Sequence, residues 1–459
     1  MFSATERPGA ALLWHTLGAP VTITQAFMTA FDGISILAVL HLALAVPLAV
    51  HALLTKPQEA AAVGWIALVL LSPFAGSALY LLFGINRIER RARRLRRHGG
   101  VFQPMPVPAA IPGLDAPTSV ERALFRATSA VQDLPLTPGN SVEPLVDGDQ
   151  AFPAMLAAID RATESVALSA YIFDHDTVGE RFAEALGRAH ARGVAVRVLI
   201  DDLGQLYSRK AIAPDLVRRG ITVAKFIPRN PKFIALINLR NHRKMLIVDG
   251  REAFIGGMNI RHGHVISDNP RHPVRDIHFR VVGPVIDQMS EVFVEDWQFA
   301  AGAEIALPLW RPEFAVPASG PTLARLVPDG PDYHFEKLLW VIMGAIGASA
   351  SSILIMTPYF LPPLSLANAL MVAAQRGIAV DVVLPARSNV FFMDWAMQAN
   401  FEVLLDRGVR IHHSPAPFDH SKVLVVDRTW CLIGSTNWDQ RSLRLNFEAN
   451  LECFDAVLA

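Results

Sequence analysis

Cysteine and charge are both scarce in this sequence. Only two of its 459 residues are cysteines, Cys431 and Cys453, and both lie in apolar, strand-like surroundings. Two thiols make neither a disulfide framework nor a metal-binding spacing, so we expect two core cysteines in a reducing compartment. Charged residues make up 18% of the chain, against 52% hydrophobic residues. The shortage of charge is not spread evenly.

Two long stretches, Ile34–Leu54 and Ala60–Phe83, contain no Asp, Glu, Lys or Arg. A helix of about 20 residues crosses the hydrocarbon core of a bilayer. Two buried core helices are an alternative, but such helices rarely stay uncharged for so long. A signal peptide would carry basic residues ahead of its apolar region, and only Arg7 precedes the first stretch. We therefore predict an N-terminal transmembrane hairpin within residues 1–98, with spans at about 34–54 and 60–83.

A basic segment follows the second stretch. Residues 87–98 contain seven arginines and one glutamate, whereas the connector 55–60 has a single basic residue, Lys56. Basic residues beside a span stay in the cytoplasm and attract anionic headgroups. The alternatives are a solvated helix and a nucleic-acid patch, which would be poorly placed here. We expect both termini in the cytoplasm and no nucleic-acid partner.

The rest of the chain divides into a linker and two similar halves. Residues 99–120 contain five prolines, and we assign 99–139 as a linker, 140–310 as a first lobe and 325–459 as a second. Each half repeats the order helix, strand, helix, strand, which builds parallel strand pairs covered by helices. The second helix of each half ends in Arg-Gly, where glycine suits the left-handed position. The predicted elements are 152–163, 165–173, 179–193 and 194–201, then 335–347, 351–360, 364–377 and 378–385.

One motif occurs twice with the same spacing. In each copy a lysine stands two residues after a histidine, 12 before a glycine and 15 before an asparagine. This agreement indicates an internal duplication and a pair of similar lobes. The copies are His242, Lys244, Gly256 and Asn259, and then His420, Lys422, Gly434 and Asn437.

These residue types suit chemistry at a phosphodiester. Histidine is a nucleophile and a proton donor near neutral pH, lysine neutralises an oxyanion, and an asparagine amide donates to a phosphate oxygen. A single His-x-Lys is more often the start of a surface strand than a catalytic motif. Its duplication favours the catalytic interpretation. One histidine would attack phosphorus while the other protonates the leaving oxygen.

Four carboxylates accompany the motifs. Asp249 and Asp427 are the last residues of the two His-x-Lys-x4-Asp segments, and we list them with the catalytic residues. Because they face away from the histidines, we expect them to fix a turn. Asp276 and Glu448 lie on the next strand of each half. A carboxylate in that place holds a histidine tautomer and stabilises the imidazolium, so we assign both an orienting role. The alternative for these two is an ordinary strand charge.

The motifs resemble the signature of the phospholipase D superfamily, His-x-Lys-x4-Asp followed by Gly-x2-Asn. HRKMLIVD (242–249) with GGMN (256–259) matches it, as does HSKVLVVD (420–427) with GSTN (434–437). Within the superfamily the sequence is most similar to the bacterial cardiolipin synthases. The segment 63–84 resembles their second span, and RNHRK, TPYF and NWDQRSLRLNFEANLE resemble their catalytic lobes.

The resemblance implies an α/β fold of two pseudo-symmetric lobes, with mixed sheets flanked by helices and one site at their interface. It implies no metal or other cofactor and a phosphatidyl-histidine intermediate. By analogy, His242 is the nucleophile and His420 the general acid and then base, although the pseudo-symmetry allows the reverse. Asn259 and Asn437 bind the substrate phosphate. Relatives continue past the last strand, whereas this sequence ends at Ala459, so we expect poorer packing near Glu448.

The implied activity is transfer of a phosphatidyl group from one phosphatidylglycerol to another with release of glycerol, at the bacterial inner membrane and with cytoplasmic lobes. The nearest alternative is a membrane-bound phospholipase D that hands the same intermediate to water. A tethered phosphodiesterase or nuclease fits the two predicted spans less well, and an inactive scaffold fits the intact motifs less well. Neither the acceptor nor the oligomeric state can be read from the sequence.

Overall fold

The computed structural model describes residues 23–56, 59–85, 117–208, 210–227, 239–302, 320–331 and 334–459. The chain divides into two compact units, residues 1–87 and 88–459, and each is described by itself. The predicted arginine-rich segment 87–98 and the linker up to residue 116 lie outside the described residues.

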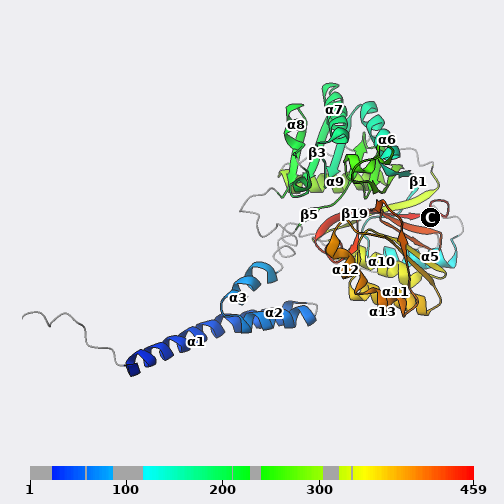
Figure 1. Cartoon of the computed structure of the whole chain (residues 1–459). Coiled ribbons are helices and arrows are strands. Elements are labelled where there is room, and N and C mark those ends of the chain that lie inside the picture. Colours follow the sequence, from blue (N-terminus) through cyan, green and yellow to red (C-terminus); the bar gives the residue numbers. More distant parts are fainter. Residues whose placement is uncertain are drawn as a thin grey trace, which may run out of the picture. The chain divides into compact units, whose positions relative to one another are not determined.

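The N-terminal unit, blue in Figure 1, is built around one long apolar helix, α1 (Ile23–Thr55). Its part Ile36–Thr55 has 20 residues and a mean hydropathy of 2.3. Among the described residues this is the one helix long and apolar enough to cross a membrane, and it coincides with the first predicted span.

The second predicted span, 60–83, is not confirmed as a continuous helix. It consists of α2 (Glu59–Leu71), α3 (Ala75–Leu79) and a π-helical turn, η1 (Tyr80–Gly84). Pro73 interrupts the run because it lacks an N–H and disfavours helix in the residue before it. Phe74 follows with a left-handed φ of 57°. The 13 residues of α2 span about 20 Å, short of the ~30 Å hydrocarbon core.

Both histidines of α1 have partners in this second stretch. The Nε2 of His41 lies 3.1 Å from the carbonyl oxygen of Leu70, and the Nδ1 of His51 lies 2.8 Å from the hydroxyl of Tyr80. These hydrogen bonds connect the two apolar stretches. They also satisfy polar side chains whose burial without a partner would be unfavourable.

The C-terminal unit consists of α5 and two lobes with a similar order of elements. α5 (Ser119–Ser129) begins at a capping box in which Thr118 and Glu121 exchange hydrogen bonds. The first lobe, cyan and green in Figure 1, contains β1 (Thr137–Val146), α6 (Asp147–Arg161), β2 (Ser165–Ala170), α7 (Thr177–Ala191), β3 (Ala195–Asp201), η2 (Gly204–Tyr207), α8 (Ala213–Arg218), β4 (Thr222–Phe226), β5 (Arg240–Asn241), β6 (Met245–Val248), β7 (Glu252–Gly256), η4 (His262–His264), η5 (Ile266–Asp268), β8 (Val274–Arg275), β9 (Ile277–Val282) and α9 (Ile286–Ala301).

The second lobe, yellow to red, repeats this plan with an additional helix after β13. It contains β10 (Thr322–Asp329), α10 (Lys337–Ala348), β11 (Ser352–Met356), β12 (Phe360–Leu361), α11 (Leu364–Gln375), β13 (Ala379–Pro385), α12 (Phe391–Gln398), α13 (Phe401–Leu405), β14 (Arg410–Ser414), β15 (Phe418–Asp419), β16 (Val423–Val426), β17 (Trp430–Gly434), β18 (Trp438–Asp439) and β19 (Asn446–Phe454).

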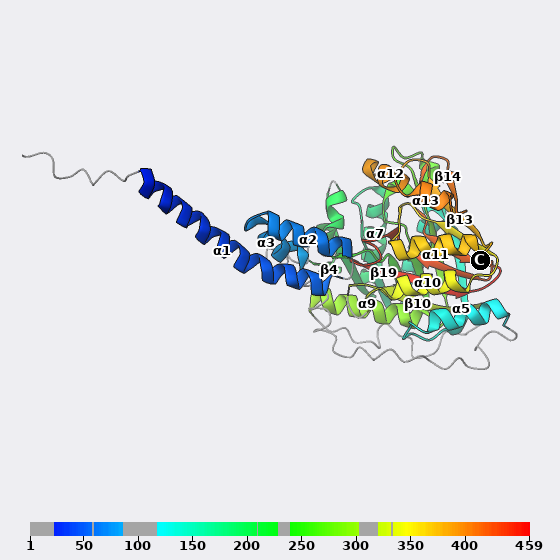
Figure 2. The same cartoon turned by 90° about the horizontal axis from the view of Figure 1, so that it is seen from below.

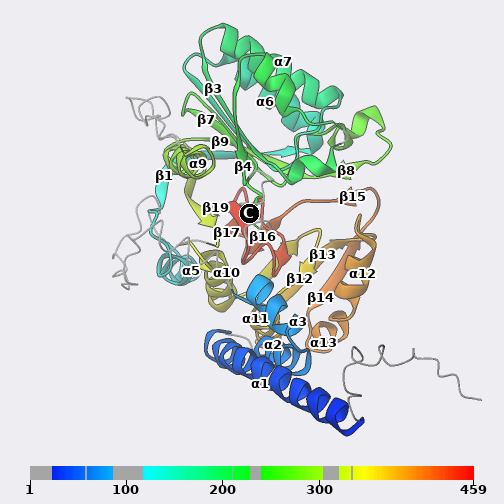
Figure 3. The same cartoon turned by 90° about the vertical axis from the view of Figure 1, so that its left-hand side faces the viewer.

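One sheet runs through both lobes and displays the duplication directly. The first lobe contributes the order β4-β3-β2-β6-β7-β9-β1 and the second β14-β13-β11-β16-β17-β19-β10. The two orders meet where β1 pairs with β10, with Thr137 opposite Ala324. β2 and β3 are parallel, as are β11 and β13, whereas β6 and β16 run antiparallel to their neighbours. The predicted pseudo-symmetric lobes with mixed sheets are confirmed, and Figure 3 shows them one above the other.

Helices cover both faces of this sheet. α6 and α7 pack on the first lobe, and α10 and α11 on the second, each pair over its own apolar core. A third core lies under α9 and includes strands of both lobes, from Met245 in β6 to Leu451 in β19. In Figure 2, α9, β10 and α5 lie along one side of the unit. Because both lobes contribute to this core, the boundary between them is part of the buried interior.

Two local predictions are confirmed by the backbone and burial. Gly193 and Gly377 follow α7 and α11 with φ of 92° and 88°, the left-handed conformation expected after Arg-Gly. Cys431 and Cys453 are buried, free thiols that lie opposite each other in β17 and β19.

Candidate active site

The two histidines lie on segments that cross between the lobes. β5, directly before His242, pairs in parallel with β19, and the backbone N–H of His242 donates to the carbonyl of Phe447 at 2.9 Å. β15, directly before His420, pairs in parallel with β8, and the N–H of His420 donates to the carbonyl of Arg275 at 2.8 Å. Each histidine is therefore held against the opposite lobe, with at most 9% of its surface exposed.

The two carboxylates that we expected to orient the histidines each lie beside the histidine of the opposite lobe. The Nδ1 of His242 lies 2.9 Å from the Oε2 of Glu448, on β19 of the second lobe. The Nδ1 of His420 lies 2.9 Å from the Oδ2 of Asp276, which precedes β9 of the first lobe. A carboxylate acceptor assigns the proton to Nδ1, which leaves each Nε2 for chemistry. The sequence placed one such carboxylate in each half, and the structure shows that each serves the histidine of the other half.

Both lysines fold back onto their own histidines. The ammonium of Lys244 donates to the carbonyl of His242 at 2.7 Å. The ammonium of Lys422 lies 3.0 Å from the Nδ1 of His420 and also donates to the carbonyl of that residue. Burial lowers the pKa of Lys244 to about 7 and that of Lys422 to about 8. A bound anion at this site would therefore stabilise the protonated form of both lysines.

The two histidine–carboxylate pairs differ electrostatically. Burial raises the pKa of Asp276 to about 6. Burial also acts to raise the pKa of Glu448, but His242, Lys244 and a serine hydroxyl outweigh it and lower the pKa. Burial lowers the pKa of His242, and burial together with both lysines lowers that of His420 well below its ordinary value. Glu448 is therefore the more firmly ionised carboxylate.

A single substitution between the two motif copies explains part of this difference. The hydroxyl of Ser435 donates to Glu448 at 2.5 Å, and the amide of Asn446 donates to the other carboxylate oxygen at 3.1 Å. Gly257 takes the place of Ser435 in the first copy, and a Cβ there would lie only 2.8 Å from the Oδ1 of Asp276. Glu448 is fully buried, so the packing loss that we expected around it is not seen.

The motif asparagines lie at the same site with different partners. The Oδ1 of Asn259 accepts from the backbone N–H of Ile172 at 3.2 Å, which leaves its amide group to donate elsewhere. The amide of Asn437 donates to Ser442 at 3.4 Å, and its buried Oδ1 has no hydrogen-bond partner among the described residues. Both side chains are at least 92% buried (8% and 6% exposed).

The motif aspartates, which we expected to fix a turn, make hydrogen bonds of that kind. Asp249 has a φ of 52° and accepts four hydrogen bonds, from the hydroxyl of Thr163 and the backbone N–H groups of Thr163, Glu164 and Ser165. Asp427 has a φ of 54° and does the same for residues 350–352. Each fixes the start of a central strand, β2 or β11, and does not contact the histidines.

The sequence reasoning missed two residues of the site. The ring of Tyr171 lies 4.8 Å from that of His242, and the ammonium of Lys244 lies 5.4 Å from its centroid. Arg243, between the motif histidine and lysine, is buried; its Nε donates to the carbonyl of Glu448 and its Nη1 to Asp296 at 2.5 Å. Arg243 stood within the motif and could have been noticed, whereas nothing local marks Tyr171.

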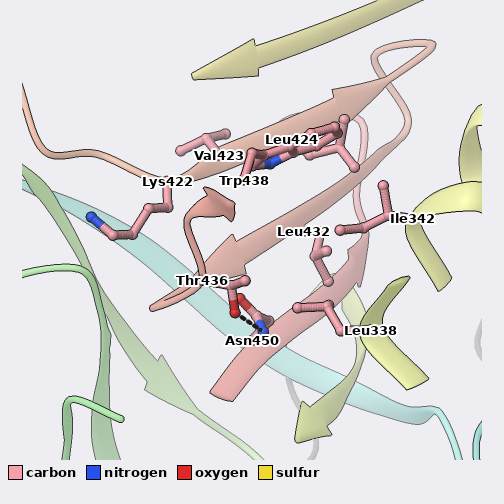
Figure 4. Close-up of a pocket in the computed structure, with 9 residues that line it drawn as sticks. All are labelled: Leu338, Ile342, Lys422, Val423, Leu424, Leu432, Thr436, Trp438 and Asn450. Atoms are coloured by element: carbon pink, nitrogen blue, oxygen red, sulfur yellow. Dashed lines mark hydrogen bonds between the residues drawn. The ribbon is translucent and has the colours of Figure 1, made fainter. Parts of the chain in front are cut away.

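A small cavity lies beneath the second motif (Figure 4). Its volume is about 10 Å3, room for about one water molecule, so it cannot hold a phospholipid headgroup. Asn450 donates to Thr436 at 2.8 Å along its wall. The ammonium of Lys422 points away from the apolar lining (Figure 4) and lies beside the ring of His420.

The sequence matches two described protein families and several known proteins. Residues 155–297 and 342–459 match the family described as "Cardiolipin synthase, PLD-like domain", and residues 43–84 match "Phospholipase_D-nuclease N-terminal". The chain is 32% identical to cardiolipin synthase A of Pseudomonas fluorescens Pf-5, with 92% of this chain and 88% of that protein covered. It is 31% identical to the major cardiolipin synthase ClsA of Bacillus subtilis, with 93% and 90% covered.

A solved structure shows the same fold. The phosphatidylserine synthase of Haemophilus influenzae superposes with a TM-score of 0.56 at 16% identity, covering 74% of this chain and 87% of that one. Duplicated lobes around a shared pair of histidine motifs define a protein of the phospholipase D superfamily. Within it, the chain belongs to the cardiolipin synthase family.

Proposed function

We propose that this protein is a membrane phosphatidyltransferase that makes cardiolipin from two molecules of phosphatidylglycerol. The observation that carries the proposal is the exchanged pairing of His242 with Glu448 and of His420 with Asp276. This pairing holds both imidazole rings at the lobe boundary, close to the ammonium groups of the two lysines. It leaves the Nε2 of each ring free for chemistry. The names of the family and its relatives support the choice of lipid.

In the first half of the reaction, Nε2 of His242 attacks the phosphorus of the donor lipid. An N–P bond forms and the bond from phosphorus to the headgroup glycerol oxygen breaks. Protonated His420 gives its proton to that oxygen, and free glycerol leaves. Lys244, Lys422 and the amide groups of Asn259 and Asn437 hold the phosphate oxygens while charge builds on them.

In the second half, a hydroxyl of the acceptor's headgroup glycerol gives its proton to His420. Its oxygen attacks phosphorus, the N–P bond breaks, and His242 returns to its starting form. Asp276 and Glu448 hold the two rings in position and stabilise the positive charge that each acquires in turn.

The differing carboxylates favour His242 as the nucleophile. A firmly ionised Glu448 stabilises the cationic phosphohistidine that a nucleophile becomes. Burial and the two nearby lysines lower the pKa of His420 well below its ordinary value, which makes protonated His420 the stronger acid. This argument supports the assignment that family analogy suggested.

We also propose that the protein is held at the bacterial inner membrane with its lobes in the cytoplasm. The apolar helix α1 would cross the bilayer, and the interrupted second stretch would enter beside it as a kinked helix, which its bonds to His41 and His51 support. The arginines at 87–98 would keep the following residues on the cytoplasmic side.

The direct test uses purified full-length protein in phosphatidylglycerol vesicles without added metal. We expect cardiolipin and glycerol in equal amounts, with phosphatidic acid as a minor product. Excess glycerol should drive the reaction backwards, because the same intermediate serves both directions. Dominant phosphatidic acid, with no effect of glycerol, would replace this proposal by a phospholipase D.

A further inference from the structure

A buried arginine inside the first motif connects the two lobes. Arg243, the middle residue of the first His-x-Lys, is 2% exposed. Its Nη1 donates to the carboxylate of Asp296 on α9 at 2.5 Å. Its Nε donates to the backbone carbonyl of Glu448 on β19 at 2.9 Å, and its Nη2 donates to that of Asp329 on β10 at 3.3 Å. α9 belongs to the first lobe and both strands belong to the second, so one side chain spans the lobe boundary.

The carboxylate of Asp296 holds both sequence neighbours of His242. Its Oδ1 accepts from Arg243, and its Oδ2 accepts from the amide of Asn241 at 3.1 Å. The Oδ1 of Asn241 accepts in turn the backbone N–H of Arg243 at 3.1 Å. All three residues are at most 2% exposed. His242 therefore stands between two residues that are fixed to the same acid of α9.

The same arginine also fixes the segment that carries the partner of His242. The Nδ1 of His242 lies 2.9 Å from the Oε2 of Glu448, and its backbone N–H donates to the carbonyl of Phe447. Arg243 holds the backbone of Glu448 through its Nε, and its guanidinium lies 5.5 Å from the centroid of the Phe447 ring. The placing of the Glu448 carboxylate against the ring of His242 thus depends on contacts of Arg243.

The second motif copy repeats the turn but not the arginine. Asp419 accepts the backbone N–H of Ser421 at 2.9 Å, as Asn241 does for Arg243. Ser421 takes the place of Arg243, and a single hydroxyl cannot reach three separate elements. The bridge between the lobes therefore occurs only at the motif of the proposed nucleophile, which indicates a role specific to that half of the site.

We propose that Arg243 and Asp296 are positioning residues, which hold Glu448 so that its carboxylate keeps the ring of His242 aligned for attack on phosphorus. A buried ion pair is often no more stabilising than apolar residues of the same volume, so stability alone gives little reason for this pair. Catalytic groups, by contrast, must be held within about 0.5 Å of their productive geometry. The effect on the rate rests on the proposed function, whereas the effect on the contact between His242 and Glu448 does not.

The test compares single and double substitutions of the pair in full-length protein. Arg243→Met and Asp296→Asn each leave a buried charge without its partner and should lower the melting temperature. The double variant removes both charges, keeps an acceptor for Asn241 and should regain most of that loss. Its folded fraction should nevertheless form the covalent adduct with labelled phosphatidylglycerol at least tenfold more slowly in a single turnover. Arg243→Lys keeps the charge but has no Nε donor for Glu448, and it should slow adduct formation as well.

A second buried ion pair provides the matched control. The Nε of Arg325 donates to the Oε2 of Glu452 at 2.5 Å, and both residues are at most 2% exposed. The further partners of this pair lie on α5 and β17, among them Trp430, whose indole N–H donates to Glu452 at 2.9 Å. Arg325→Met with Glu452→Gln removes both charges and keeps an acceptor for that indole. This double variant should form the adduct within threefold of the rate of the unsubstituted protein.

A measurement without substrate tests the positioning itself. A double-mutant cycle of His242→Ala and Glu448→Gln, read by thermal unfolding, reports the contact between the two side chains. We expect its coupling to disappear when Arg243→Met and Asp296→Asn are both present. The coupling should remain when the substitutions at Arg325 and Glu452 are present instead.

The outcomes separate positioning from a merely structural role. If the rate of adduct formation recovers together with the melting temperature, or if the coupling persists without the Arg243 pair, the proposal is overturned. An equal loss of rate in both double variants would overturn it too. If the coupling disappears as expected but the unsubstituted protein forms neither adduct nor cardiolipin, the positioning is supported and the proposed function fails.

Discussion

Ser435 and Gly257 occupy the same position in the two motif copies, yet only Ser435 gives its carboxylate partner a hydroxyl donor. The donor lies 2.5 Å from Glu448, whereas Gly257 leaves Asp276 without an equivalent. The two halves of the site are thus unequal in spite of their common fold.

Ser435→Ala should weaken the His242 side of the site. Loss of a hydrogen bond to a buried charge costs about 1.5–3 kcal/mol, so we expect turnover to fall at least tenfold. The pKa of Glu448 should rise because a group that favours its ionised form is removed. The acid limb of kcat/KM should then move to higher pH. Ser290→Ala, at a buried serine of α9, is the control; an unmoved acid limb would contradict the prediction.

The histidines should share a large loss of turnover but differ in the intermediate. His242→Ala and His420→Ala should each lower turnover by several orders of magnitude, since residues that act as a unit give non-additive losses. Labelled lipid should remain covalently trapped in His420→Ala and not in His242→Ala. The opposite pattern would reverse the roles. His412→Ala, at an exposed histidine paired with Asp381, should leave turnover unchanged.

The exchanged pairing can be tested by stability alone. In a double-mutant cycle, His242→Ala and Glu448→Gln should show a coupling of about 1–2 kcal/mol in the free energy of unfolding, because the groups are in contact. The cycle for His242→Ala with Asp276→Asn should show close to none. Thermal unfolding of the purified variants measures both. Equal coupling in the two cycles would mean that the carboxylates are not exchanged.

The motif aspartates should affect stability more than chemistry. Asp249→Ala or Asp427→Ala removes four hydrogen bonds at the start of a strand, and we expect a loss of about 2–4 kcal/mol in the free energy of unfolding. The folded fraction should keep a turnover within about threefold of the unsubstituted enzyme. A loss of several orders of magnitude at unchanged melting temperature would give these residues a chemical role. Asp268→Ala, at an exposed ion pair, is the control.

The pH dependence should report Lys244. Burial lowers the pKa of this lysine to about 7, and only the protonated amine can neutralise the substrate phosphate. The cation is lost as the pH rises through that value, so kcat/KM, which reports the free enzyme, should decline above about pH 7. Lys244→Arg keeps the charge at all these pH values, and its alkaline decline should disappear. A decline that persists unchanged would assign it to another group.

Much of the fold could be predicted because its signals are local or repeated. The spacing of the two motifs identified both lobes, and the Arg-Gly pairs located the ends of α7 and α11. The break at Pro73 was missed because composition records the length of an apolar run but not the conformation of Ser72 and Phe74. The exchange of Asp276 and Glu448 was also out of reach, since it depends on how β5 and β15 cross between the lobes. The place of Tyr171 beside His242 has the same origin.

β5 and β15 each pair with a strand of the opposite lobe. Both histidine–carboxylate pairs therefore form only when the two lobes are docked. Glu448 follows His242 by 206 residues in the chain, so during synthesis the first lobe is complete before the carboxylate that hydrogen-bonds to His242 has been made. Any later separation of the lobes would break both histidine–carboxylate hydrogen bonds at once. Partial separation of the lobes would therefore remove both contacts together, so the integrity of the site depends on the integrity of the lobe boundary.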